Sequence, residues 1–162
     1  MGTITIDSDG LTIEELVRVA RGGASIAFSE AAVRRIEAAR GLIDRWVREG
    51  RRIYGVTTGF GALSDVAISA KDTRRLQENI LMSHAAGVGS PLAEEVVRAT
   101  MLLRAKDFAC GHAGIRRETA QQLVELMNRG VVPVVPEKGS VGASGDLAPL
   151  AHLALVLIGK GE

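Results

Sequence analysis

The most informative stretch of the sequence is Gly139-Ser-Val-Gly-Ala-Ser-Gly-Asp-Leu-Ala-Pro-Leu-Ala-His152. At its centre, Ala143-Ser144-Gly145 can form an electrophile, a kind of group that the standard side chains lack. Attack of the Gly145 amide nitrogen on the Ala143 carbonyl, with loss of two waters, closes an imidazolone ring and leaves Ser144 as an exocyclic methylene. Glycine suits the attacking position because it has no Cβ to obstruct a tight backbone approach.

Composition describes a globular protein that can build one core, with 162 residues, 46% hydrophobic and 24% charged. The net charge of +1 gives no electrostatic support for binding nucleic acid. A single cysteine, Cys110, excludes an internal disulfide and fits a reducing cytoplasm. No apolar run reaches the roughly 20 residues of a membrane span, and no set of His, Cys, Asp and Glu has metal-ligand spacing. We therefore expect a cytoplasmic protein without a nucleic acid, membrane or metal partner.

Hydrophobic periodicity predicts a mainly α protein with short strands at residues 3–6 and 24–28. The predicted helix starts are the Thr12–Glu15 capping box, Ser29, Ser69, Pro91, Arg116 and Asp146. Trp46 is predicted to anchor the apolar stripe of the helix after Ser29 in the core. The run from Leu147 to Ile158 is apolar on nearly every side, so other parts of a protein are expected to cover it.

Two further motifs accompany the first. Tyr54-Gly-Val-Thr-Thr-Gly-Phe-Gly61 is a glycine-rich loop, and no lysine follows it as a phosphate-binding loop requires. Leu76-Gln-Glu-Asn-Ile-Leu-Met-Ser-His-Ala-Ala-Gly-Val-Gly89 is a helical pattern that ends at glycine. Taken alone, Tyr54 is more simply a packing residue, and His84 a hydrogen-bonded residue at a helix C-terminus.

Together the three motifs resemble the aromatic amino acid ammonia-lyases, the family of histidine, phenylalanine and tyrosine lyases and aminomutases. The resemblance runs from about Leu11 to Glu162. It implies the N-terminal part of the ammonia-lyase helical fold, which is fumarase/aspartase-like, with minor short β elements and a glycine-rich catalytic loop. It also implies that Ala143-Ser144-Gly145 forms 4-methylidene-imidazol-5-one (MIO) autocatalytically, beside Asp146, with no metal and no nucleotide.

The resemblance assigns roles to further residues. Tyr54 inherits the role of the base that removes the β-hydrogen of the substrate. The residues expected to bind the substrate are Gly61, Leu81, Ser83 and His84. A histidine at position 84 can hydrogen-bond an imidazole or a phenol, which favours deamination of L-histidine to trans-urocanate and ammonia.

Some positions depart from the expected pattern. Thr57 instead matches tyrosine lyases and tyrosine 2,3-aminomutases, so tyrosine stays an alternative substrate. Lys106 stands where the family usually has asparagine, and Ala113 where serine is common. These two departures concern local packing or hydrogen bonding around the site.

The resemblance implies that residues 1–162 correspond only to the N-terminal, MIO-bearing domain of the family, and we expect the large C-terminal helical part to lie outside this chain. We therefore expect the chain alone to be inactive. Its expected partners are an aromatic amino acid, a second polypeptide carrying the C-terminal part, and copies of itself in a tetramer-like assembly in which Tyr54 and Ser144 meet across chains. The alternative from another class is a non-catalytic interaction module.

Overall fold

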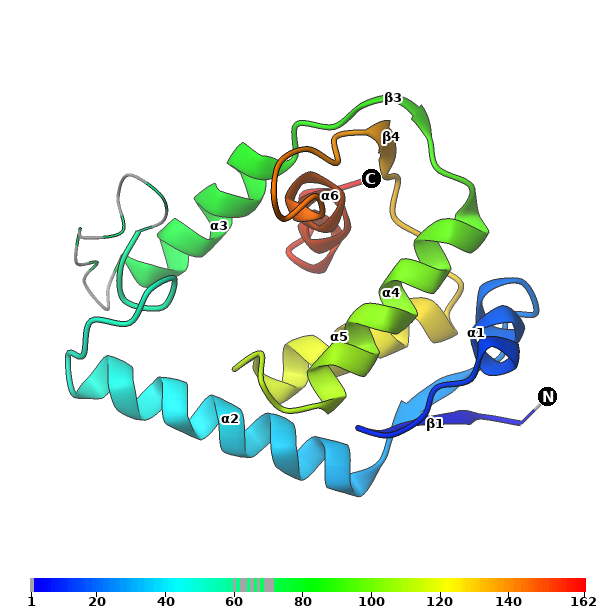
Figure 1. Ribbon diagram of the computed structural model, residues 1–162, viewed down its shortest axis with the longest axis horizontal. Helices are drawn as coiled ribbons and strands as arrows, with labels where there is room; N and C mark the ends of the chain where they lie inside the picture. The colour runs from blue at the N-terminus through cyan, green and yellow to red at the C-terminus, as the bar shows by residue number, and fades with distance from the viewer. Residues whose placement is uncertain (1, 60, 62–63, 65, 67, 69–71) are drawn as a thin grey trace.

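The computed structural model describes residues 2–59, 61, 64, 66, 68 and 72–162 (Figure 1). These residues form a mainly helical protein, which confirms the predicted fold class. The elements in chain order are β1 (Ile4–Ile6), α1 (Ile13–Ala20), β2 (Ile26–Phe28), α2 (Glu30–Arg48), α3 (Thr73–His84), β3 (Val88–Pro91), α4 (Glu94–Ala109), α5 (Arg117–Asn128), β4 (Pro136–Lys138) and α6 (Leu147–Leu157). In the described part of the chain, no helix combines the length and the apolar character that crossing a membrane requires.

The main core lies around α4, which packs against α1, α2, α5 and β1. Met101 and Leu102 of α4 are completely buried, and Leu123 of α5 is almost completely buried. Strands β1 and β2 pair in parallel and bury Ile6 and Ile26 against these helices. The side chain of Asn128 at the end of α5 accepts from the amide of Ile26 and donates to its carbonyl, both at 2.9 Å. This pairing fixes a sheet edge that would otherwise have unpaired backbone groups.

A second group of elements consists of α3, α6 and the antiparallel pair of β3 and β4. Figure 1 shows α6 between α3 and the pair of α4 and α5, and α6 packs against both α3 and α5. The α6 helix is only partly covered: Ala151 and Leu153 are buried and the other residues between positions 148 and 157 are half-buried, while Leu147 at its start is 55% and Ile158 after its end 38% exposed. The expectation of complete cover is therefore not met within this chain.

The capping residues confirm two predicted helix starts. Thr12 and Glu15 form a complete capping box at α1, and the Ser29 hydroxyl accepts from the Ala32 amide at the start of α2. The predicted cap Ser69 lies outside the described residues, and α3 begins at Thr73 after Asp72. A cap acts between neighbours along the chain, so the sequence is enough to predict it.

Two predictions were wrong. Pro91 is the last residue of β3, in register with Pro136 of β4, and α4 begins three residues later at Glu94. The pairing with β4, which a local rule for proline cannot foresee, holds Pro91 in a strand. Trp46 is half-buried rather than part of the core, and the guanidinium of Arg51 lies 5.6 Å from the centre of its ring.

A charged cluster ties the N-terminal strand to α2 and α4. The Asp7 carboxylate accepts hydrogen bonds from the Ser29 hydroxyl, from the Ser8 amide at 2.6 Å and from the Arg35 guanidinium. The Lys106 ammonium donates to the carbonyls of Asp7 (2.7 Å) and Ser8. Lys106, one of the departures from the family pattern, therefore caps the end of β1.

This cluster predicts an acid-dependent loss of stability. The hydrogen bonds from Ser29 and Ser8, with Arg35, hold the pKa of Asp7 well below its usual range. A carboxyl whose pKa is lower in the folded than in the unfolded protein stabilises the fold above the unfolded value of about 4, and this contribution is lost as the pH falls further. We expect Asp7→Asn to lower the free energy of unfolding at pH 7 and to flatten its decline below about pH 4. Urea unfolding of both proteins from pH 7 to pH 3 measures this, and identical pH slopes would contradict it.

Candidate functional site

The tripeptide Ala143-Ser144-Gly145 lies in an exposed turn between β4 and α6. Gly142 and Gly145 have φ angles of 82° and 76°, in the left-handed region that favours glycine. The Ser144 hydroxyl donates to a carboxylate oxygen of Asp146. Asp146 does occupy the N-cap position of α6, but its side chain makes no capping bond, contrary to prediction. Its carboxylate is engaged by Ser144 instead.

These residues fit the ring closure that the sequence suggests. Ala143 and Ser144 are exposed, so no packed side chain holds the turn in its uncyclised form. A Cβ on Gly145 would lie 3.3 Å from the Ser140 hydroxyl oxygen, and the positive φ would strain any other residue there. Loss of the Ser144 hydroxyl as water needs a base for the Ser144 Cα hydrogen and a proton delivered to the leaving oxygen. The Asp146 carboxyl group is hydrogen-bonded to that oxygen and can exchange a proton with it. The turn therefore has the residue types that cyclisation needs and an acid–base group beside the hydroxyl that leaves.

The C-terminal end of α3 carries the predicted substrate-binding pair. The Nδ1 atom of His84 lies 2.8 Å from the Ile80 carbonyl oxygen and 3.1 Å from the Ser83 hydroxyl oxygen. Because a carbonyl can only accept, Nδ1 carries the hydrogen and Nε2 of the neutral ring is an acceptor. Ser83 also donates to the Ile80 carbonyl at 3.0 Å, and Leu81 is half-buried on the same helix. His84 is thus held as an acceptor for an N–H or O–H group.

The strands bring this end of α3 to the turn that contains Ser144. Strand β3 follows α3 and pairs with β4, which leads into the turn, and the Leu92 amide donates to the Val135 carbonyl at 2.8 Å. A Cβ on Gly139 would lie 3.1 Å from the Gly87 Cα and 3.2 Å from the Ala148 Cβ. The backbone after α3, the start of the turn and α6 therefore meet at close range.

Tyr54 lies elsewhere in this chain. Its loop starts after α2 and approaches the N-terminal end of α3, whereas the turn of residues 139–146 lies by the C-terminal end (Figure 1). The 12 residues of α3 make it about 18 Å long. Within one chain, the loop of Tyr54 and the turn of residues 139–146 therefore lie by different ends of α3.

The Tyr54 loop is held at its base and exposed at its tip. The Thr57 hydroxyl accepts from the Ile53 amide at 2.9 Å and donates to the Arg51 carbonyl. Tyr54 is 64% exposed, and Gly61 has a φ of 53°. Thr57, the departure that matches tyrosine-specific relatives, thus has a structural role within the loop.

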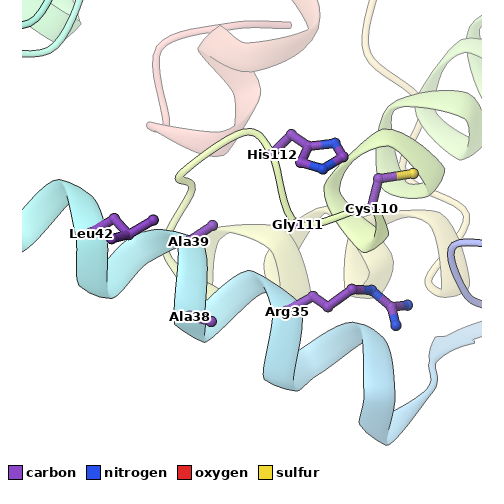
Figure 2. A pocket seen from close by; sticks show the side chains of 7 residues that line it. All are labelled: Arg35, Ala38, Ala39, Leu42, Cys110, Gly111 and His112. Atoms are coloured by element: carbon purple, nitrogen blue, oxygen red, sulfur yellow. The ribbon is translucent and has the colours of Figure 1, made fainter.

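A pocket of the surface lies away from all three motifs. Figure 2 shows it between α2 and the segment after α4, lined by Arg35, Ala38, Ala39, Leu42, Cys110, Gly111 and His112. Within the described residues, no group of three His, Cys, Asp or Glu side chains lies close enough to hold a metal ion. The candidate site therefore consists of the turn of residues 139–146 and the C-terminal end of α3. Within one chain this site is exposed at Ser144.

Sequence reasoning missed the junction at Gly87. Its amide donates to Nε2 of His152 on α6, at 3.0 Å. The sequence does not indicate this partner of His152. The available signal was the set of glycines at 87, 89 and 139, since glycine often marks a close backbone approach.

Comparison with known proteins identifies the family. The family described as Aromatic amino acid lyase matches residues 11–162. Histidine ammonia-lyase of Caldanaerobacter subterraneus subsp. tengcongensis is 57% identical over 162 residues, which cover 100% of this chain and 32% of that protein. The chain thus spans about a third of the length of the curated relatives that it matches.

Solved structures agree with this assignment. Histidine ammonia-lyase from Trypanosoma cruzi superposes with a TM-score of 0.84 at 40% identity, over 94% of this chain and 29% of that one. The ergothioneine-degrading enzyme ergothionase from Treponema denticola gives a TM-score of 0.94 at 30% identity, over 98% and 32%. Since the family match covers nearly the whole sequence and the fold agrees, the chain belongs to the aromatic amino acid lyase family.

Proposed function

We propose that this chain supplies the electrophile and the side-chain recognition of a lyase that deaminates L-histidine to trans-urocanate and ammonia. The turn in which Ser144 donates to Asp146 carries this proposal, because it has the residues that MIO formation needs and a carboxyl group beside the hydroxyl that must leave. The identity of 57% to a histidine ammonia-lyase supports the choice of reaction and substrate. The expected roles of Ala143, Ser144 and Gly145 as MIO-forming residues, with Asp146 beside them, rest on the same turn.

The chemistry requires two groups. Elimination of ammonia removes a weakly acidic β-hydrogen and expels a poor leaving group, and MIO, once formed, supplies an electrophile for the amino group. Tyr54 is proposed as the base, which must lie within about 3 Å of the proton that it removes. Since the loop that starts at Tyr54 and the turn of residues 139–146 lie by opposite ends of α3, we propose that the base comes from another copy of this chain.

Substrate recognition is assigned to the end of α3. His84 presents Nε2 as an acceptor, which suits the N–H of a histidine imidazole or the O–H of a tyrosine phenol but not a bare phenyl ring. Ser83, Leu81 and Gly61 complete the proposed substrate-binding set. Thr57 favours tyrosine as the second candidate substrate, in a tyrosine ammonia-lyase or tyrosine 2,3-aminomutase.

Activity is proposed for the assembled lyase, by which we mean copies of this chain together with the C-terminal part of the family. The half-covered α6 supports such an assembly, because Leu147 and Ile158 leave apolar surface exposed. A non-catalytic assembly module is the alternative. It predicts neither the MIO absorbance nor turnover in the assembled protein.

A direct comparison of substrates tests the proposal. We expect the assembled lyase to deaminate L-histidine with a higher kcat/KM than L-tyrosine, as the 57% identity to a histidine ammonia-lyase suggests. Formation of urocanate and coumarate, followed by chromatography, measures both reactions. His84→Leu, which removes the acceptor, should lower the kcat/KM for both substrates, because each offers this acceptor an N–H or O–H group. If the assembled lyase deaminates tyrosine but not histidine, the substrate assignment is wrong.

A further inference from the structure

The contact between Gly87 and His152 joins the two halves of the candidate site. The Gly87 amide, three residues after His84, donates to Nε2 of His152, eight residues after Ser144. The two partners are 65 residues apart in the sequence, and both are half-buried. This hydrogen bond therefore links the backbone behind the substrate-binding histidine directly to the helix that follows the MIO-forming turn.

The close packing around Gly87 makes this link specific. A Cβ on Gly87 would lie 3.0 Å from Nε2 of His152 and 3.2 Å from the Pro136 Cβ. A Cβ on Gly139 would lie 3.1 Å from the Gly87 Cα. Three segments thus meet at Gly87: the segment after α3, strand β4 with Gly139 after it, and α6. Because they are closely packed, a displacement of one segment displaces the other two.

An ion pair between α3 and the segment after α6 is a weaker link. Lys160 and Glu78 form an ion pair at 3.4 Å, with side chains 44% and 34% exposed. Exposed pairs of this kind contribute little, because water screens the attraction and two long side chains must be ordered. A half-buried hydrogen bond to a ring nitrogen has a defined direction and distance. Of these two links, the bond to His152 is the one that can fix a geometry.

We propose that His152 is a positioning residue of the lyase, which holds the segment after α3 in register with the MIO-forming turn so that His84 and Ser144 keep a fixed separation. The inference rests on the proposed function for its catalytic consequence, although the hydrogen bond itself does not. Because an amide can only donate, Nε2 accepts and Nδ1 carries the hydrogen. A glutamine at position 152 can offer a side-chain carbonyl as acceptor, whereas leucine fills similar space without one.

The test compares His152→Leu with His152→Gln in the assembled lyase, with His112→Leu as the matched control. His112 is exposed and lies at the pocket of Figure 2, away from the candidate site. We expect His152→Leu to keep the MIO absorbance but to lower kcat by about 10-fold to 100-fold, because small misplacements of reacting groups are costly. His152→Gln should recover most of the loss, and His112→Leu should match the wild type. Equal kcat values for leucine and wild type, or equal losses for leucine and glutamine, would overturn the proposal.

A second readout separates this inference from the proposed function. We expect hydrogen exchange of the peptide containing Gly87, followed by mass spectrometry, to speed up in His152→Leu and to slow again in His152→Gln. Unchanged exchange in His152→Leu overturns the link even if the enzyme is active. A wild-type protein without chromophore or turnover contradicts only the proposed function, because the exchange result still decides the role of His152. If His152→Leu does not assemble, Gly87→Ala disturbs the same contact from the other side and is expected to give the same loss of kcat.

Discussion

Replacing Ser144 by alanine is expected to remove the MIO absorbance and to reduce histidine turnover in the assembled lyase by at least about 1000-fold, or about 4 kcal/mol of transition-state stabilisation. The exocyclic methylene of the electrophile comes from the Cβ of Ser144 after its hydroxyl leaves, and alanine has no group to eliminate. In the structure this hydroxyl already donates to Asp146. Absorbance of the purified protein and the rate of urocanate formation measure the two effects.

Ser140→Ala is the matched control, since it removes a hydroxyl from the same turn and leaves the sequence Ala143-Ser144-Gly145 unchanged. It should retain the absorbance. Asp146→Asn, which keeps Ser144 but weakens its proton acceptor, should slow formation of the chromophore. An active Ser144→Ala protein would show that the reaction does not use this electrophile.

Tyr54→Phe is expected to separate formation of MIO from removal of the β-hydrogen of the substrate. The phenol is proposed as the base, and a positioned base contributes about 10²-fold to 10⁴-fold to the rate. The substitution removes only one oxygen from a side chain that is 64% exposed in this chain, so folding and MIO formation should continue. We therefore expect normal absorbance with kcat reduced by a factor in that range.

Mixed assemblies sharpen this prediction. If the base comes from another copy of the chain, inactive Tyr54→Phe and inactive Ser144→Ala chains should regain part of the activity when assembled together, because some sites then contain both intact residues. Activity that stays absent in the mixture would contradict a site shared between chains. Full activity of Tyr54→Phe alone would exclude Tyr54 as the base.

The local parts of the fold could be predicted from sequence. The capping box at Thr12 and the cap at Ser29 act over three residues, and both are present. Strands β3 and β4 were missed because each is short and consists of exposed or half-buried residues, and their pairing joins Val88 to Lys138. Such a pairing leaves no periodic pattern in either segment. Trp46 fits the apolar stripe of α2, but the sequence does not say where the core ends along that helix.

The residue types of the candidate site could be predicted from the sequence, but most of the distances between these residues could not. The motif that contains Ser144 identified the turn, and its position just before α6 follows from its glycines and from the apolar run after it. The separation of Tyr54 from Ser144 along α3 could not be measured from spacing in the sequence. The contacts of Lys106 with the carbonyl of Asp7 and of His152 with Gly87 connect residues 99 and 65 positions apart. Only the folded chain reveals such partners.

The most direct test of the central claim is the intact mass of this chain in the assembled lyase. The account predicts a mass lower than that of the sequence by two waters, with the loss confined to the peptide that contains Ala143-Ser144-Gly145 and absent from Ser144→Ala. An unmodified mass in a preparation that deaminates histidine would contradict it.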